Sequence, residues 1–409
     1  MLLLHRTESI SKSAAQDLTF VIKHPLKLYI FTTYLHENNS YMNILIINPI
    51  LHTIANDKMW PEFKTIKDTM IYGMALGFIK LGHTVTLATC ANYKPSRLEN
   101  YDFDVIFFKS NISRIAKPAR LPFSWDFIKY LSNNHQKFDL VVASECFQLY
   151  TLAASIICPS KTVIWQEMNL HQRIMLKIPS KIWHNVVVPI FMRQIRCIIP
   201  RSVSAKEFIS QYTCRVSSQT VDHGIDIDKF PASIHKKRQL ISSSRLIVRK
   251  GVDGIIRNFN CLHKITEYSD IKLIIAGRGP EESNLRKIVS DNNLNEYVEF
   301  VGFLPRHELG KMISESMALL INTSQDLNIV SIPESISAGT PVLTTSLTAL
   351  SSFINTNKLG IAKKTWTENE MIDIINNNPV YSENCCNIRN QLSSQYAAQK
   401  IIDIAMTQQ

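Results

Sequence analysis

The sequence predicts an α/β fold built from two doubly wound domains of the Rossmann type. Two observations carry this prediction. Short, continuously apolar segments alternate with helix-length amphipathic ones, and the same alternation begins again in the second half of the chain. A short apolar run closed by proline or glycine is typical of a strand buried on both faces, as in a parallel sheet. At 409 residues the chain is long enough for two such domains, each with its own core.

The first domain is expected to begin at Met42, with a buried strand at 43–49 (NILIINP). A helix is predicted at 68–83, where apolar residues recur at helical spacing and Gly82 suits the left-handed residue at a helix end. Further strands are predicted at 84–89, 104–108, 139–144 and 162–166. Strands separated by helix-length segments favour a parallel sheet.

The pattern restarts with a strand in 238–247 that leads into a helix. The later strands are predicted at 272–277, 297–302, 318–322 and 341–345, with helices at 281–292 and 306–314. Between the halves, 223–239 is polar, proline-containing and basic, as is typical of an exposed linker. The predicted parts are an N-terminal extension (1–41, a poorly ordered arm or an upstream reading-frame extension), a first domain (42–230), a second domain (231–385) and a C-terminal helix (386–409).

The net charge of +11 favours an anionic partner, such as a phosphorylated substrate, anionic lipid head groups or nucleic acid. No nucleic-acid recognition motif accompanies the charge, so we expect no nucleic-acid partner. The segment 168–206 contains basic residues and Trp183 but no Asp or Glu. One interpretation is peripheral membrane contact through 168–206, and the other is a core-facing helix with a solvated basic face.

No stretch of about 20 nearly uncharged residues suggests a membrane span. The most apolar early stretch, 18–35, is interrupted by Lys23, His24, Pro25 and Lys27. The eight cysteines lack the spacing of a zinc site or a disulfide framework, which favours buried reduced thiols. The expected location is the cytoplasm, including the inner face of the cytoplasmic membrane.

The segment QDLNIVSIPESISAGTPV (325–342) follows a predicted strand and carries two acids, Asp326 and Glu334, eight positions apart. Pro333 suits the first turn of a helix, and the N-terminus of that helix would point out of the carboxyl edge of the sheet and favour a phosphate. Glu334 has an alternative role, because Ser331 and Glu334 fit the S-x-x-E capping box. Asp326 by itself also fits a solvated loop acid, which is the alternative to a ligand-binding role.

A basic turn, SSSRLIVRKGVD (242–253), follows the first strand of the second domain. Arg245 and Lys250 could grip a diphosphate there, since a charge-assisted hydrogen bond contributes about 1.5–3 kcal/mol and a helix dipole only roughly 0.3–1 kcal/mol. A solvated basic face is the alternative. Gly277 and Gly279 follow the next strand, where glycine serves a turn or lets backbone approach a ligand.

Together these segments resemble glycosyltransferase family 4, whose enzymes have the GT-B fold. The resemblance rests on SRLIVRKGVD, IIAGRGPEESNL, VEFVGFLPRHEL and SIPESISAGTPVL in this order, and it covers roughly 42–409. It implies a retaining glycosyltransferase that moves a sugar from a nucleotide-diphosphate donor to a glycan or lipid-linked acceptor, in cell-surface polysaccharide or lipopolysaccharide assembly. It implies no cofactor and no metal, and the D-x-D triplets 102–104 and 226–228 are interpreted as chance or loop-capping acids.

The resemblance also implies roles for individual residues. Arg245 and Lys250 would bind the donor diphosphate, Asp326 would contact the donor sugar as the first acid of an E-x7-E motif, and Glu334 would hold the ribose. Further donor-side residues are Asn328, Ile329, Val330, Gly277, Gly279 and Gly302. On the acceptor side, Gln166 and Glu167 stand where the family often has a histidine. The chain after about residue 385 should cross back onto the first domain as a helix.

The chain departs from the family pattern in its donor loop. The first acid is Asp326 rather than Glu, Leu327-Asn328 replaces Gly-Phe, and Thr348-Ala349 replaces a glycine pair. These departures leave a second hypothesis open, a GT-B scaffold without turnover that serves as a binding or partner subunit of a glycan assembly complex. A nicotinamide dehydrogenase is excluded, because Glu282 stands at the last glycine of the G-x-G-x-x-G fingerprint.

Overall fold

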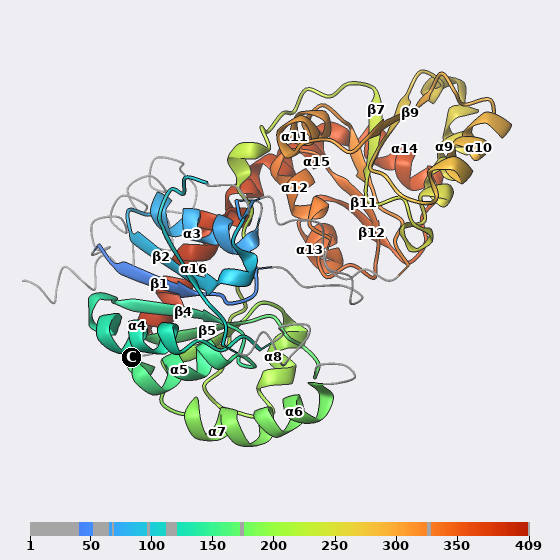
Figure 1. Ribbon diagram of the computed structural model, residues 1–409. Coiled ribbons are helices and arrows are strands. Elements are labelled where there is room, and N and C mark those ends of the chain that lie inside the picture. The colour runs from blue at the N-terminus through green and yellow to red at the C-terminus, as the bar shows by residue number, and fades with distance from the viewer. Residues whose placement is uncertain are drawn as a thin grey trace, which may run out of the picture. The chain divides into compact units, whose positions relative to one another are not determined.

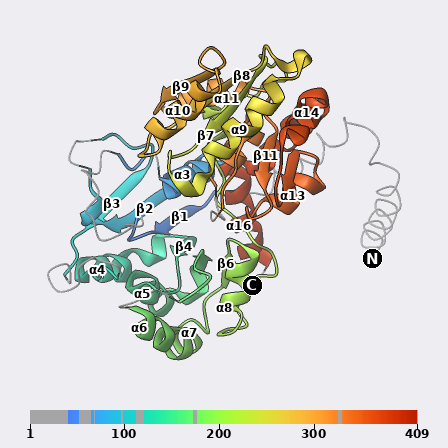
Figure 2. The ribbon, with the colours of Figure 1, turned by 90° about the vertical axis from the view of Figure 1, so that its right-hand side faces the viewer.

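The computed structural model describes residues 41–51, 65–67, 69–95, 99–111, 121–171, 176–324 and 329–407. The chain divides into a unit of Met1–Met42 and a unit of Asn43–Gln409, and every helix and strand below lies in the second. This unit contains two six-stranded sheets, each wholly parallel and covered by helices (Figures 1 and 2). The predicted α/β class with two doubly wound domains is therefore confirmed.

The first sheet has the strand order β3-β2-β1-β4-β5-β6. Its strands are β1 (Asn43–Ile47), β2 (Thr84–Cys90), β3 (Asp104–Phe108), β4 (Leu140–Ser144), β5 (Thr162–Gln166) and β6 (Cys197–Pro200). The order reverses where β1 pairs with β4, and ligands of doubly wound sheets bind outside the carboxyl ends of the strands at such a point. β6 has no counterpart among the predicted strands, because its four residues are too short a run to be distinguished from the apolar helical segment before it.

Helices cover this sheet on both faces (Figure 2). They are α3 (Met70–Lys80), α4 (Trp125–Asn134), α5 (Leu149–Ile157), α6 (Lys177–Ile182), a π-helical turn (Trp183–Val187), α7 (Val188–Phe191) and α8 (Val203–Ile209). α3 confirms the helix predicted at 68–83: the Thr69 hydroxyl accepts a hydrogen bond from the Tyr72 amide at its start, and Gly82 has φ +88° beyond its end.

The second sheet repeats the topology, with the order β12-β11-β10-β7-β8-β9. Its strands are β7 (Gln239–Ser243), β8 (Lys272–Ala276), β9 (Val298–Gly302), β10 (Ala318–Leu320), β11 (Val342–Thr345) and β12 (Gly360–Lys363). Here the order reverses where β7 pairs with β10. β12 was not predictable as a strand, since only two of its four residues, Ile361 and Ala362, are apolar and larger than glycine.

Two apolar cores lie on the two faces of the second sheet, because successive strand residues point to opposite sides. Leu240 of β7 belongs to one core and Ile241 to the other. The first core is closed by α9 (Val252–His263), α10 (Glu282–Asp291) and α14 (Glu368–Asn376). The second is closed by α11 (Arg306–Ser314), α12 (Ser331–Ser337), α13 (Ser351–Thr356) and α15 (Asn378–Ile388).

The C-terminal helix α16 (Ser394–Thr407) packs against α3 of the first domain. A Cβ on Gly77 would lie 2.3 Å from the Ser394 carbonyl oxygen, so only glycine permits this approach. A Cβ on Gly73, one turn earlier, would meet only the Ser394 hydroxyl, at 3.5 Å. The chain thus returns to the first domain as a helix through a glycine-lined contact.

The segment 223–239 is less exposed than a linker should be. Ile225 and Phe230 are buried, and Ile225 forms a parallel β-bridge with Ser393. The expectation of an exposed linker is therefore wrong for 223–230, which pack into the second domain's core, whereas most of 231–239 is exposed as expected. Both acids of its D-x-D triplet contact Lys80 Nζ, Asp226 Oδ1 at 3.2 Å and Asp228 Oδ2 at 2.6 Å.

All eight cysteines are free thiols, and five of them are buried. Cys214 and Cys261 are exposed, so the expectation of buried thiols is wrong for these two. Among the helices of the described ranges, none is both long and apolar enough to cross a bilayer.

Candidate functional site

The loop that follows β7 carries Arg245 at the carboxyl edge of the second sheet. The Ser244 amide donates to the Ala276 carbonyl (3.1 Å), and the Leu246 amide donates to the Arg278 carbonyl (3.1 Å), so the loop is tied to the chain beyond β8. Arg245 is exposed, and within the described part of the chain its guanidinium makes no hydrogen bond or ion pair. The loop therefore presents an unengaged cation on a fixed backbone.

Gly277 and Gly279 allow the chain after β8 to approach the loop after β7 closely. A Cβ on Gly277 would lie 1.9 Å from the Ser244 carbonyl oxygen, and one on Gly279 would lie 2.1 Å from the Leu246 carbonyl oxygen. Gly277 also has φ +145°, in the region that favours glycine. These glycines were expected to approach a donor, whereas the structure places them against the Arg245 loop, so their contribution to a donor site is to position that loop.

Lys250 ends a short 3-10 turn (Val248–Lys250) directly before α9. This turn is tied to the chain after β10: the Ser324 amide donates to the Arg249 carbonyl (3.0 Å), and the Asn322 side-chain amide donates to the Gly251 carbonyl (3.2 Å). Because β7 and β10 are neighbours at the reversal point, both loops lie at the edge where a ligand is expected. Asp326 and Asn328 come next in the chain but lie outside the described residues.

Glu334 lies in the first turns of α12 and is 4% exposed. The capping box does not form, because Val330 occupies the N-cap position without a side-chain cap, and Ser331 is already inside the helix. Instead, the Glu334 carboxylate forms an ion pair with Arg306 Nη1 from the start of α11. α12 has only seven residues, so the charged side chains rather than its dipole dominate the electrostatics of this edge.

Three further residues were predicted to lie on the donor side: Ile329, Val330 and Gly302. Ile329 packs against the core between α11 and α12, whereas Val330 is exposed. Gly302 ends β9 with φ +69°, and its carbonyl accepts the Gly277 amide at 2.7 Å. Gly302 would thus affect a ligand indirectly, by holding the backbone of Gly277 in place.

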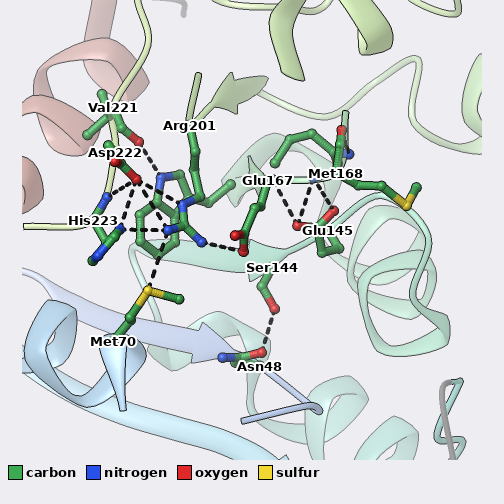
Figure 3. Close-up of polar contacts among 12 residues, drawn as sticks. Asn48, Met70, Ser144, Glu145, Glu167, Met168, Arg201, Val221, Asp222 and His223 are labelled. Atoms are coloured by element: carbon green, nitrogen blue, oxygen red, sulfur yellow. Dashed lines mark hydrogen bonds and ion pairs between the residues drawn. The ribbon is translucent and has the colours of Figure 1, made fainter. Parts of the chain in front are cut away.

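The carboxyl edge of the first sheet carries a polar network, of which the sequence had singled out only Glu167 (Figure 3). Asn48 follows β1 and Ser144 ends β4, the two strands at the reversal point, and the Ser144 hydroxyl donates to Asn48 Oδ1 at 2.8 Å. The next residue, Glu145, has φ +64°, an uncommon backbone conformation for a residue with a side chain. Its carboxylate accepts the amides of Glu167 (2.8 Å) and Met168 (3.2 Å) beyond β5.

Arg201, directly after β6, organises the other half of this network (Figure 3). Its guanidinium bonds Glu167 Oε2 at 2.6 Å and Asp222 Oδ1 at 3.2 Å, and it lies 2.7 Å from His223 Nδ1. It also stacks on the Trp165 ring, 4.7 Å from the centroid. With only 9% of its side chain exposed, Arg201 is a fixed, largely desolvated cation.

The network shifts the acidity of two carboxyl groups. Burial, with the negative charge of Glu167 added, raises the pKa of Glu145 to about 7, although two backbone amides favour its charged form. For Asp222, burial acts in the upward direction, but the hydrogen bond and charge of His223 and the charge of Arg201 outweigh it and lower the pKa. Glu145 is thus close to half-protonated at neutral pH, while Asp222 remains ionised.

Gln166 and Glu167, the predicted acceptor-side residues, differ in environment. Gln166 is buried, its Oε1 accepts the Cys146 amide (2.9 Å), and its Nε2 donates to the Met168 carbonyl (3.0 Å). Gln166 therefore shapes the loop from within and does not offer a free polar group. Glu167 is half-exposed and ion-paired to Arg201.

A hollow that is open to solvent lies between the two edges, and the space in it, open solvent included, is about 500 Å³. Met70 and His223, which contact Arg201, line it together with Arg306 and Val330 from the second domain. Among its charged lining residues, Lys67, Lys229 and Arg306 outnumber Asp226, which is paired with Lys229 (3.7 Å), so the excess of positive charge favours an anionic ligand. In the described ranges, no group of three or more His, Cys, Asp or Glu side chains is arranged to hold a metal ion. Asp102 of the other D-x-D triplet accepts the Tyr72 hydroxyl at 2.7 Å.

Comparison with known proteins identifies the second domain most clearly. Residues 225–378 match the family model described as "Glycosyl transferases group 1". The chain is 29% identical over 109 residues to the GtfA subunit of the UDP-N-acetylglucosamine–peptide N-acetylglucosaminyltransferase of Limosilactobacillus reuteri, 27% of this chain and 20% of that protein. It is 22% identical over 186 residues to the alpha-monoglucosyldiacylglycerol synthase of Streptococcus pneumoniae, 42% of each chain. The chain thus spans less than half the length of these curated relatives.

Solved structures resemble the chain over most of its length. HepE of Anabaena in complex with UDP has a TM-score of 0.60 at 14% identity, covering 90% of this chain and 100% of that one. A glycosyltransferase from Rickettsia africae has a TM-score of 0.61 at 13% identity, covering 90% and 99%. At this level of identity the likeness establishes the fold, which is the two-domain GT-B fold.

Proposed function

We propose that the protein is a glycosyltransferase that moves a sugar from a nucleoside-diphosphate donor to a glycan or lipid-linked acceptor. The observation that carries the proposal is that the segment similar to a glycosyltransferase family also contains the predicted donor-binding residues. The segment 225–378, which matches the group 1 family model, is the part of the chain that brings Arg245, Lys250 and Glu334 to one edge of the second sheet. We place the reaction in cell-surface polysaccharide, lipopolysaccharide or glycolipid assembly, in the cytoplasm.

On the donor side, the chemical task is to neutralise charge that develops on the leaving diphosphate. Arg245 is free to turn toward it, and Lys250 stands one short turn further along the same loop. Glu334 would hold the ribose once Arg306 releases it, which Arg306 can do because 45% of its side chain is exposed. We assign the charge neutralisation to these side chains and not to a metal, and we propose retention of the anomeric configuration.

On the acceptor side, the proposal uses the hollow between the two edges. The acceptor hydroxyl would enter beside His223 and Met70, whose positions Arg201 fixes. Asp326 would contact the donor sugar from the loop that follows β10. No cofactor is needed for this chemistry beyond the donor itself.

The test is a product assay with a panel of UDP-, GDP- and ADP-sugars. Release of nucleoside diphosphate is followed in time, and the anomeric configuration of the transferred or hydrolysed sugar is determined by proton NMR. We expect one donor to be used, with release abolished in Asp326→Ala and unaffected in Asp291→Ala, a matched acid on the exposed face of α10. Inversion of configuration would refute the retaining mechanism.

The second candidate is the GT-B scaffold without turnover. The Arg306–Glu334 ion pair favours it, because the carboxylate expected to hold the ribose is already engaged. Binding of a nucleotide without release of any sugar, in a folded protein and with every donor of the panel, would support this candidate and contradict the enzyme.

A further inference from the structure

The segment from Lys177 to Phe191 has one face that packs and one face that does not. It comprises α6, the π-helical turn and α7, and lies at the surface of the first domain (Figure 1). The inward side chains recur every four residues and are all buried: Ser180, His184, Val188 and Met192. They anchor the segment on the core formed with Ile164 and Ile198 of β5 and β6.

The outward face is apolar and exposed. Its side chains are Ile178 (70% exposed), Ile182 (58%), Val186 (48%), Ile190 (61%) and Phe191 (44%). The first four are offset by two residues from the buried stripe, which is about 200° around a helix, so they point away from the core. Exposed apolar side chains gathered on one face, unlike scattered ones, mark an interaction site.

The charged residues of this segment itself all have the same sign. Lys177, Lys181 and Arg193 are exposed beside it, and 168–206 contains no acidic residue. Of the two interpretations of this segment, the core-facing helix with a solvated basic face describes only the buried stripe. The outward face alternates basic and apolar groups, which is the composition of helices that lie in the plane of an anionic membrane surface.

We propose that this face, defined by Ile178, Ile182, Val186, Ile190 and Phe191 with their flanking basic residues, docks the protein on an anionic lipid bilayer. The apolar side chains enter the head-group region, and Lys177, Lys181 and Arg193 contact anionic head groups. Charge complementarity selects a bilayer over a second copy of this chain, since two such faces would bring like charges together. The inference does not depend on the proposed transfer reaction.

The test is vesicle co-sedimentation of the full chain, with pure phosphatidylcholine or with equal parts phosphatidylcholine and phosphatidylglycerol. We expect binding to the anionic vesicles only, weakened by added salt. Ile182→Glu/Ile190→Glu should lower the partition coefficient by at least about tenfold, because two apolar contacts are lost and two charges are repelled. The matched control is Ile234→Glu, an exposed isoleucine (57%) outside the segment, which should bind as the wild type does.

A second pair of variants isolates the charge. Lys177→Gln/Lys181→Gln should lower the partition coefficient roughly 20- to 30-fold, whereas Lys264→Gln/Lys287→Gln, an exposed pair directly after α9 and on α10, should not change it. Circular dichroism melting confirms that each variant is folded. Equal binding by test and control variants, or no binding to anionic vesicles, would overturn the proposal. Self-association that is lost in Ile182→Glu/Ile190→Glu, without vesicle binding, would reassign the face to a protein contact. Nucleotide titration of the same variants reports on the donor site separately.

Discussion

Gly277→Ala should displace the loop that carries Arg245, even if Gly277 itself does not contact the donor. The added Cβ would lie 1.9 Å from the Ser244 carbonyl oxygen, and because such contacts do not fall below 3.0 Å, the Arg245 loop must move by at least about 1.1 Å. Overpacking costs about 1–3 kcal/mol, and a side chain at φ +145° adds roughly another 1–3 kcal/mol. We therefore expect a loss of about 2–6 kcal/mol in the free energy of unfolding.

The same shift displaces Arg245, so nucleoside diphosphate affinity should fall about tenfold or more, as when one charge-assisted hydrogen bond is lost. Urea denaturation measures the stability, and calorimetric titration below the melting temperature measures the affinity. The control is Gly302→Ala, which also has a positive φ (+69°) but whose Cβ would meet only the flexible Arg278 side chain, at 3.4 Å. If both variants unfold at the same urea concentration and bind nucleotide equally, the positioning role of Gly277 is refuted.

Three further predictions concern the first domain. Because the pKa of Glu145 is raised to about 7 in the folded protein, its ionisation lowers the free energy of unfolding as pH rises from about 4.5 to about 7. Glu145→Gln should remove roughly 3 kcal/mol of this decrease, as measured by chemical denaturation across that pH range. An unchanged pH profile would contradict this prediction. Gly77→Ala should lower the unfolding free energy by about 1–3 kcal/mol, while Gly73→Ala raises it by up to about 1 kcal/mol; equal effects would mean that α16 does not pack there. Arg201→Gln should cost about 1–2 kcal/mol in urea denaturation, a modest value because its carboxylate partners are half-exposed, and Arg201→Lys should restore less than half of it. A full rescue by lysine would refute the forked contact.

The sheets were predictable because strands of a buried parallel sheet are short, continuous apolar runs, and segments such as NILII and KLIIA have this pattern. β6 and β12 escaped prediction because four residues carry too little pattern. The capping box at Ser331 shows a different limit. The motif is local, but whether it forms depends on where the helix begins, and the helical conformation of Val330 moves that point by one residue.

On the proposed donor side, the sequence could predict that Arg245, Lys250 and Glu334 follow strands of one sheet, while their binding roles stay predictions. The contacts of the candidate site were not predictable, because Arg306 reaches Glu334 through the packing of α11 on α12, and Arg201 gathers residues from several loops. The polar network of the first sheet could have been found from the sequence. Asn48 and Ser144 each lie at the carboxyl end of a predicted strand, where ligand-binding groups gather in this topology.

Calorimetric titration of UDP, GDP and ADP shows whether a nucleotide site lies at the carboxyl edge of the second sheet. The titrations are made with the wild type, Arg245→Ala, Glu334→Ala and the control Arg286→Ala, an arginine on α10 that pairs with Glu282 and lies over the Phe300 ring. We predict that one nucleotide binds, that Arg245→Ala and Glu334→Ala each weaken it at least about tenfold, and that Arg286→Ala does not. Equal binding by all four proteins, or no binding by the folded wild type, would mean that Arg245 and Glu334 do not form a nucleotide site.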